Sequence, residues 1–185
     1  MLIIDNYDSF TYNIVEYIKI LGITPVVINN DEMTLNEIKK LSFSRIILAP
    51  GWGNPDNSGV TLDVTDYFKD TKKILGVCLG MQCIAKYFGA NIIKSKNPCH
   101  GKNSKIFFKE DFKLFKGFNQ GFEGTRYHSL MVEKETKDVE ITAHTEDKIP
   151  MALKIKGKEI YGVQFHPEAI LTENGIQIFK NFISL

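Results

Sequence analysis

The stretch Ile74-Leu75-Gly76-Val77-Cys78-Leu79-Gly80-Met81-Gln82 joins an apolar run to the start of a helical pattern. The run through Val77 predicts a buried strand, and the residues that follow predict a helix ended by Gly89. Cys78 lies at the junction, with a glycine two residues away on each side. Glycines leave room for a sharp strand-to-helix turn, which holds the side chain between them out above a sheet. The stretch therefore predicts an α/β fold with a thiol at the end of a strand.

The same junction predicts chemistry at Cys78. The helix would aim its amino end at the sulfur, where the helix dipole favours negative charge and free backbone N–H groups can stabilise an oxyanion. An isolated cysteine is more often a small buried hydrophobic residue. The paired glycines and the strand-helix context favour a nucleophile instead.

Outward from this junction, strands and helices alternate through the first half of the chain. Strands are predicted at 2–5, 26–28, 46–48 and 74–77, and helices at 9–21, 34–41, 62–68 and 79–88. Thr34 and Glu37 have the spacing of a capping box at the start of one helix. Apolar strands that alternate with helices indicate a parallel sheet covered on both faces.

The second half, from about Ala90, contains few helical patterns. Short strand-like pieces occur at 92–93, 106–108, 139–143, 151–155 and 160–164, and a last helix is predicted at 173–182. We expect these pieces to add antiparallel strands to the same sheet. No repeat, linker or low-complexity tract interrupts the chain, so we predict a single domain over residues 1–185.

Composition excludes several classes of protein. The 185 residues are 43% hydrophobic and carry a net charge of +1, so no overall field attracts nucleic acid or an anionic membrane. No apolar run approaches the roughly 18 to 20 residues of a membrane helix, and no signal peptide is recognisable. Three cysteines are an odd number, which favours reduced thiols in the cytoplasm.

A base for the thiol is predicted in the segment Gly162-Val163-Gln164-Phe165-His166-Pro167-Glu168. His166 follows an apolar strand, where active sites of α/β proteins gather. Pro167 favours an extended backbone, in which residues two apart point to the same side, so Glu168 would lie beside His166. The carboxylate could hold one ring nitrogen and leave the other free to activate Cys78.

Other motifs carry less. The loop Pro50-Gly51-Trp52-Gly53-Asn54-Pro55 begins like a dinucleotide fingerprint, but Asp56 occupies the third glycine position and Pro55 is expected to block a helix start. Gly101-Lys102 lacks the preceding glycine of a phosphate loop. The cysteines and histidines lack zinc-finger spacing, so no metal site is predicted. Three further residues have no expected role: we expect Cys83 to lie in the core, Cys99 to be incidental, and His144 to lie on the surface.

The assembled pattern resembles the class I, triad-type glutamine amidotransferases, and among these the glutaminase subunits of chorismate-aminating synthases. The resemblance covers almost the whole chain. It is carried by segments 5–13, 50–55 and 76–80, His100-Gly101-Lys102, Arg126-Tyr127-His128-Ser129-Leu130, and 162–173. It implies a flavodoxin-like three-layer fold with a central, mostly parallel sheet and antiparallel additions in the C-terminal half.

The resemblance also implies roles for individual residues. Cys78, His166 and Glu168 would form a triad that hydrolyses L-glutamine through a γ-glutamyl thioester. The backbone N–H groups of Gly51 and Leu79 would form the oxyanion hole. The glutamine would be bound by Gly51, Trp52, Gly53, Gln82, Ser129 and Leu130.

A partner is implied as well, because nothing in the chain resembles a chorismate or Mg²⁺ site. The glutaminase needs no cofactor of its own, and Mg²⁺ is expected only on the synthase subunit that receives the ammonia. We expect aminodeoxychorismate synthase as that partner, with anthranilate synthase as the alternative. A further alternative is that this chain is a subunit shared by both synthases. A stand-alone γ-glutamyl cysteine hydrolase and a non-catalytic interaction module are remoter alternatives.

Three positions depart from the family pattern: Trp52 replaces proline, Met81 replaces a common histidine, and Ala169 replaces a common serine. None belongs to the triad. The lip formed by Trp52, segment 5–10 and segment 100–102 is the expected docking surface for a partner.

Overall fold

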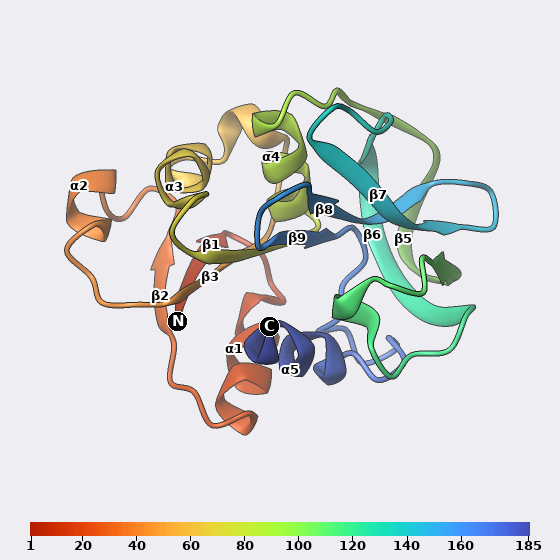
Figure 1. The fold of residues 1–185 in the computed structure, drawn as a ribbon, viewed down its shortest axis with the longest axis horizontal. Coiled ribbons are helices and arrows are strands. Elements are labelled where there is room, and N and C mark those ends of the chain that lie inside the picture. The colour runs from red at the N-terminus through yellow and green to blue at the C-terminus, as the bar shows by residue number, and fades with distance from the viewer.

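The computed structural model describes residues 1–185 and contains one sheet of nine strands in the order β2-β1-β3-β4-β9-β8-β7-β5-β6 (Figure 1). The strands are β1 (Leu2–Asn6), β2 (Val26–Asn29), β3 (Arg45–Gly51), β4 (Lys73–Val77), β5 (Ile92–Phe108), β6 (Phe122–Val132), β7 (Val139–Thr145), β8 (Pro150–Ile155) and β9 (Ile160–Val163). The helices are α1 (Thr11–Ile20), α2 (Leu35–Ile38), α3 (Thr61–Phe68), α4 (Leu79–Tyr87) and α5 (Ile176–Ser184), with 3₁₀ turns η1 (Pro55–Asn57) and η2 (Lys113–Phe115).

The pairing of the strands changes once across the sheet, from parallel to antiparallel. Strands β2, β1, β3, β4 and β9 pair in parallel, whereas β8, β7, β5 and β6 continue from β9 in antiparallel pairs. In a parallel sheet the carboxyl ends of neighbouring strands meet at one edge. Adjacent strands β4 and β9 therefore bring the residues that follow them, Cys78 and His166, to the same edge. The predicted fold class is confirmed.

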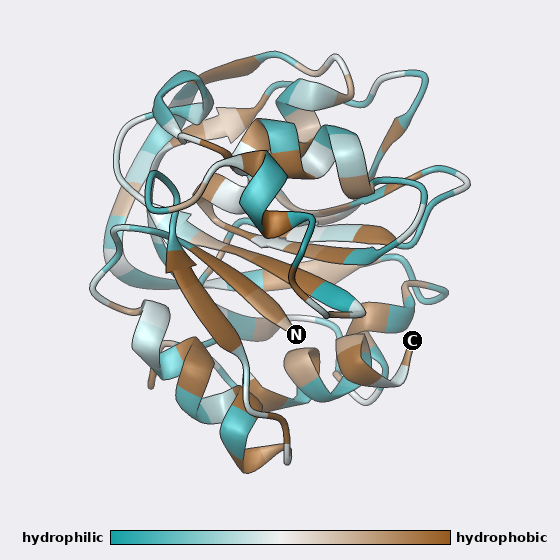
Figure 2. Ribbon diagram, turned by 90° about the vertical axis from the view of Figure 1, so that its left-hand side faces the viewer, coloured by the Kyte–Doolittle hydropathy of each residue, from teal (hydrophilic) through white to brown (hydrophobic).

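Helices cover both faces of the sheet. Helices α1 and α5 pack with η2 on one face, and α2, α3 and α4 pack on the other (Figure 1). Two hydrophobic clusters, of 25 and 20 buried residues, fill these two interfaces. The central strands are almost continuously hydrophobic, whereas the helices have one hydrophobic and one hydrophilic side (Figure 2). This difference is expected when strands are buried on both faces and helices on one.

The largest error of the sequence prediction concerns the β5–β6 hairpin. The pieces predicted at 92–93 and 106–108 are the two ends of one strand of 17 residues, and β6 was not predicted. Strand β6 contains the buried polar residues Thr125, Arg126 and His128. Because buried polar residues interrupt the hydrophobic alternation, the pattern typical of a strand is hidden.

Helix boundaries differ by a few residues from the prediction. The capping box of Thr34 and Glu37 is confirmed, but α2 ends at Ile38 instead of residue 41. Helix α1 begins at Thr11, and α5 begins at Ile176 instead of residue 173.

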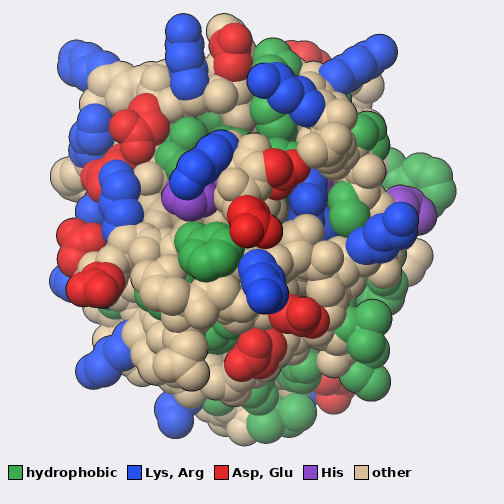
Figure 3. All heavy atoms as spheres, turned by 90° about the vertical axis from the view of Figure 1, so that its right-hand side faces the viewer, with side chains coloured by type: hydrophobic (Ala, Val, Ile, Leu, Met, Phe, Trp, Pro, Cys, Tyr) green, Lys and Arg blue, Asp and Glu red, His purple; other side chains and the backbone are tan.

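Charged side chains of both signs are intermixed on the face seen from the β5–β6 side of the molecule (Figure 3). This face presents no continuous basic surface of the kind that binds nucleic acid. None of the helices is long and apolar enough to cross a lipid bilayer.

Candidate active site

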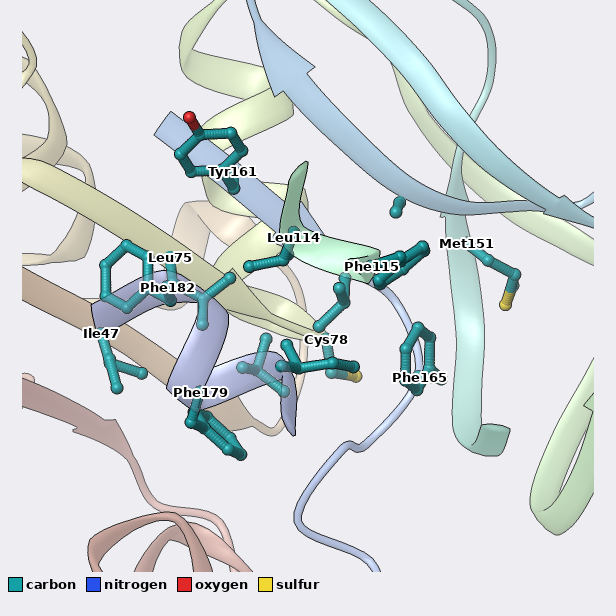
Figure 4. Packing of buried hydrophobic residues seen from close by; sticks show 14 of the residues in the cluster. Ile47, Leu75, Cys78, Leu114, Phe115, Met151, Tyr161, Phe165, Phe179 and Phe182 are labelled. Carbon is teal, nitrogen blue, oxygen red and sulfur yellow. The ribbon is translucent and has the colours of Figure 1, made fainter. Parts of the chain in front are cut away.

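Cys78 occupies a tight turn between β4 and α4. Its backbone has φ 52° and ψ −105°, a conformation unfavourable for a residue with a side chain. A Cβ on Gly76 would lie 2.5 Å from the carbonyl of Gly80, and one on Gly80 would lie 2.1 Å from the carbonyl oxygen of Leu48. Both glycines are therefore required by close backbone packing. Cys78 is a member of the larger hydrophobic cluster, and Figure 4 shows it between Phe179 and Phe165 in that view.

His166 and Glu168 form a buried pair. Nδ1 of His166 lies 2.7 Å from Oε1 of Glu168, and both side chains are almost completely buried. The adjacency was predicted, but its predicted cause, an extended backbone at Pro167, is wrong. The segment turns instead, and the N–H of Ala169 donates to the carbonyl of His166.

The His166 ring is held by packing and by backbone hydrogen bonds. The rings of Phe10 and Tyr127 contact it edge-on, with centroid distances of 6.1 and 5.2 Å. Its backbone N–H donates to the carbonyl of Thr125, and its carbonyl accepts from Oγ1 of Thr172. Nε2 is buried and has no hydrogen-bond partner. The ring is thus fixed, with one nitrogen engaged and the other unpaired.

Two opposing effects set the pKa of His166. Burial alone lowers it, but the negative charge of Glu168 and then that of Cys78 raise it well above its usual value. A histidine whose pKa is raised by neighbouring negative charges can take up a proton from the thiol.

A pocket of about 690 Å³ opens beside Cys78 and His166. It brings together all of the predicted oxyanion-hole and substrate-binding positions, namely Gly51, Trp52, Gly53, Leu79, Gln82, Ser129 and Leu130. Glu168 lies behind His166 and does not line the pocket. Another depression, of about 780 Å³ between η2 and α5, contains none of the candidate residues.

Leu79 offers a free backbone donor, and Gly51 lies at the close contact between β3 and β1. Leu79 is the first residue of α4, so its N–H has no intrahelical acceptor. Gly51 ends β3, and a Cβ there would lie 2.3 Å from the carbonyl oxygen of Asn6. The side chain of Asn6 donates to the carbonyl of Ala49, which fixes the strand end that carries Gly51.

Further polar residues, without a role in the sequence analysis except for Gln82, lie beside Cys78 or in the pocket wall. Gln164 donates to Sγ of Cys78, and Gln82 donates to Gln164. His128 and Cys99 line the pocket, so Cys99, which was expected to be incidental, lies close to the candidate site. Single polar residues of this kind carry no spacing signal, and only the fold brings them to Cys78.

Asp8, His166 and Glu168 form a group of side chains of the kinds that bind metal ions. One ligand atom each of Asp8, His166 and Glu168 lies within 4.8 Å of the others. His166 already uses Nδ1 with Glu168, and Asp8 accepts from the N–H of Phe10. These partnerships account for the cluster without an ion.

Residues expected to lie outside the site are mostly placed as predicted. Cys83 is fully buried in α4, and burial raises the pKa of its thiol to about 12. His144 is half-buried and stacks on Phe107, so it is only partly a surface residue. Pro55 does not block a helical turn: it is the first residue of η1, where proline needs no N–H partner.

The predicted docking lip is only partly exposed. Trp52 is 77% exposed, and His100 and Tyr7 are also exposed. Asp5 and Asn6 are instead buried, because Asp5 accepts from Thr11 and Asn6 bonds to the neighbouring strand.

The departures from the family pattern fit the structure at two positions. Met81 is buried against Gly162, where a Cβ would lie 2.7 Å from its Cγ. Ala169 is buried in the turn after Glu168. Trp52 projects from the pocket lip and packs little.

Comparison with known proteins identifies the family of this chain. The family model "Glutamine amidotransferase class-I" matches residues 2–185, so the chain belongs to the class I glutamine amidotransferases. The crystal structure of a Thermoplasma acidophilum protein assigned as part of a GMP synthase superposes with a TM-score of 0.88 at 26% identity, covering 99% of this chain and 91% of that one.

Curated relatives are more similar in sequence. Anthranilate synthase component 2 of Cyanophora paradoxa is 46% identical over 100% of this chain and 98% of its own length. The protein of the same name from Pseudomonas putida is 44% identical, over 99% and 96%. The bifunctional protein TrpGD of Thermotoga maritima is 43% identical, over 100% of this chain and 32% of the relative. These names favour the alternative given in the sequence analysis over aminodeoxychorismate synthase.

Proposed function

We propose that this glutamine amidotransferase is the glutaminase subunit of an anthranilate synthase and that Cys78, His166 and Glu168 are its catalytic triad. The observation that carries the triad is the His166–Glu168 bond of 2.7 Å with Nε2 left unpaired, beside a cysteine on a strained turn. The choice of anthranilate synthase is supported by the names of the curated relatives.

In the first half of the reaction, Sγ of Cys78 attacks the carboxamide carbon of L-glutamine. The thiol proton passes to Nε2 of His166, while Glu168 stabilises the charged ring through Nδ1. The N–H groups of Leu79 and Gly51 hold the oxygen of the tetrahedral intermediate. The C–N bond then breaks, His166 returns the proton to the departing nitrogen, and ammonia and a γ-glutamyl thioester result.

In the second half, His166 removes a proton from water as it attacks the thioester carbon. The C–S bond breaks, the proton passes to the sulfur, and glutamate is released. Gly51, Trp52, Gly53, Gln82, Ser129 and Leu130 bind the glutamine during both halves.

Ammonia would pass to a synthase subunit that aminates chorismate. The glutaminase needs no cofactor, and the Mg²⁺ of the amination would be bound by that subunit. All three cysteines are unpaired, which supports a reducing compartment such as the cytoplasm.

The proposal is tested by measuring glutamate release and aminated product with each purified synthase subunit in turn. We expect anthranilate from glutamine and chorismate with an anthranilate synthase large subunit, and strong stimulation of glutamine hydrolysis. Cys78→Ala should abolish glutamine-dependent synthesis but leave ammonia-dependent synthesis intact. Cys83→Ala is the matched control, because this thiol lies in the core and outside the pocket.

Other results would identify the alternatives. Product formation only with an aminodeoxychorismate synthase subunit would overturn the choice of partner and leave the glutaminase intact. Full activity on γ-glutamyl peptides without any partner would indicate a stand-alone hydrolase. Glutamine hydrolysis by Cys78→Ala would overturn the triad.

A further inference from the structure

A network of hydrogen bonds reaches the sulfur of Cys78 through the side chains of Gln164 and Gln82. Nε2 of Gln164 lies 3.6 Å from Sγ of Cys78, within range for a bond to sulfur. Oε1 of Gln164 accepts from Nε2 of Gln82 at 3.0 Å. Both glutamines are buried, at 0% and 3% exposure, so these bonds have little competition from water.

The hydrogen-bond network begins at the buried side chain of Arg126. Nε of Arg126 lies 2.9 Å from Nε2 of His128, and Nδ1 of His128 lies 2.8 Å from the carbonyl oxygen of Leu130. A guanidinium can only donate, and a carbonyl can only accept. His128 must therefore be neutral, with its proton on Nδ1. Burial, and then the charge of Arg126, lower the pKa of His128 to about 4, which agrees with this tautomer.

Donors and acceptors must also match at the two glutamines, which fixes the orientation of both side-chain amides. Nε2 of Gln82 lies 3.1 Å from the carbonyl oxygen of Leu130, so this end of the amide must be the donor. Its second hydrogen goes to Gln164, whose NH₂ group is thereby turned toward Cys78. Reversing either amide would place two acceptors or two donors in contact.

One acceptor in this hydrogen-bond network has no partner in the protein. Oε1 of Gln82 receives no hydrogen bond from the protein. It is not among the fully buried side-chain atoms that lack a partner, so this oxygen is accessible from the pocket. Gln82 also lines the pocket. Its carbonyl oxygen therefore borders the space that the substrate would occupy.

We propose that Gln164 is a further catalytic residue, which donates a hydrogen bond to the sulfur of Cys78, and that Arg126 and His128 are positioning residues that orient Gln82 and Gln164. The proposal rests on the proposed role of Cys78 as the nucleophile. Gln164 transfers no proton. Its N–H stabilises the negative sulfur before attack and again when the sulfur leaves the thioester, while His166 carries the proton in both halves. Oε1 of Gln82 is left to accept an N–H group of the substrate.

The first test is alkylation of Cys78 by iodoacetamide at neutral pH without glutamine, with the modified cysteine identified by peptide mass. Gln164→Met keeps the side-chain length but has no donor, and Gln164→Glu keeps the shape but presents an acceptor. We expect both to slow alkylation of Cys78 by about tenfold or more, because a hydrogen bond to a charged group is lost. Gln177→Met on α5 is the matched control and should react like the unmodified chain.

Steady-state kinetics separate the roles of the two glutamines. Gln164→Met should mainly lower kcat for glutamine, whereas Gln82→Met should also raise KM, because its oxygen would contact substrate. His128→Gln supplies both a donor and an acceptor, and should preserve more activity than His128→Leu. A structural role alone would give equal losses in the last two variants.

Two outcomes would overturn the inference, and neither coincides with failure of the proposed function. Alkylation of folded Gln164→Met at the unmodified rate would show that Gln164 does not act on the sulfur. If the Gln164 variants do not fold, removing the sulfur by Cys78→Ala should shift the side-chain amide resonances of Gln164 and not those of Gln177. Unshifted resonances would equally contradict the bond. Glutamine hydrolysis by Cys78→Ala would instead reject the nucleophile and leave the hydrogen bond standing.

Discussion

His128 is a neutral histidine beside a buried cation, and this makes stability depend on pH. Its folded pKa is about 4, below the usual 6.5. Between these values the unfolded chain binds a proton that the folded chain does not, so the free energy of unfolding falls as the pH is lowered from 6.5 to 4. The raised pKa of His166 adds no slope there, because His166 is protonated in both states below its unfolded pKa.

We therefore predict that His128→Gln flattens the pH dependence of stability. Across pH 6.5 to 4, the unmodified chain should lose about 3 kcal/mol more than the variant, measured by urea denaturation. His100→Gln, at an exposed histidine, controls for loss of a histidine as such. Parallel curves for His128→Gln and the unmodified chain would show that His128 is not held neutral.

At the residue scale, sequence patterns predicted Cys78, His166 and Glu168 but not the hydrogen bonds that link Cys78 to Gln164 and Gln82. Glycines at fixed spacing and an adjacent carboxylate are local signals. Gln164 meets Gln82 across 82 positions and Cys78 across 86, so no local pattern contains these contacts. They arise only when β4 and β9 pair.

At the element scale, the site depends on how closely α4 approaches the sheet. A Cβ on Gly80 would lie 2.1 Å from the backbone oxygen of Leu48 in β3, and backbone cannot move aside cheaply. We predict that Gly80→Ala destabilises the protein by about 3 kcal/mol in thermal or urea unfolding, and that it displaces Cys78. Lys86→Ala, on the solvent side of α4, should change stability by about 0.5 kcal/mol or less. Equal stabilities would mean that α4 can shift without strain.

Elements with clear periodicity were predicted, and β6 shows why another was not. Strands β1, β3 and β4 are largely apolar on both faces, and α1 and α3 have one buried side. Strand β6 buries Thr125, Arg126 and His128. Their hydrogen-bond partners lie on β5, on β6 itself and at Thr172, before α5. Burial of these polar groups is decided by tertiary hydrogen bonds, which single-sequence patterns do not contain.

At the scale of the whole molecule, the sheet separates two hydrophobic clusters that contribute to one folded state. Ile18 of α1 belongs to one cluster and Ile84 of α4 to the other. We predict that Ile18→Val and Ile84→Val each cost about 1 kcal/mol and that their effects add within about 0.5 kcal/mol, measured by a double-mutant cycle in urea.

A pair within one cluster provides the comparison. The rings of Tyr17 and Phe179 lie 6.0 Å apart in an edge-on arrangement between α1 and α5. Replacing both by leucine should reveal a coupling of about 1 kcal/mol. Strong coupling between Ile18 and Ile84 would contradict the separation of the clusters by the sheet.

The backbone at Cys78 has a wider consequence. A φ of 52° with ψ of −105° suits glycine better than any residue with a side chain, so the fold alone would favour glycine at this position. Under the proposed role of Cys78 as the nucleophile, glutamine hydrolysis and not folding is the reason for a sulfur there. In a lineage that no longer needed ammonia from glutamine, this position would be expected to drift early, and a glycine there would mark a descendant that kept the shape and gave up the reaction.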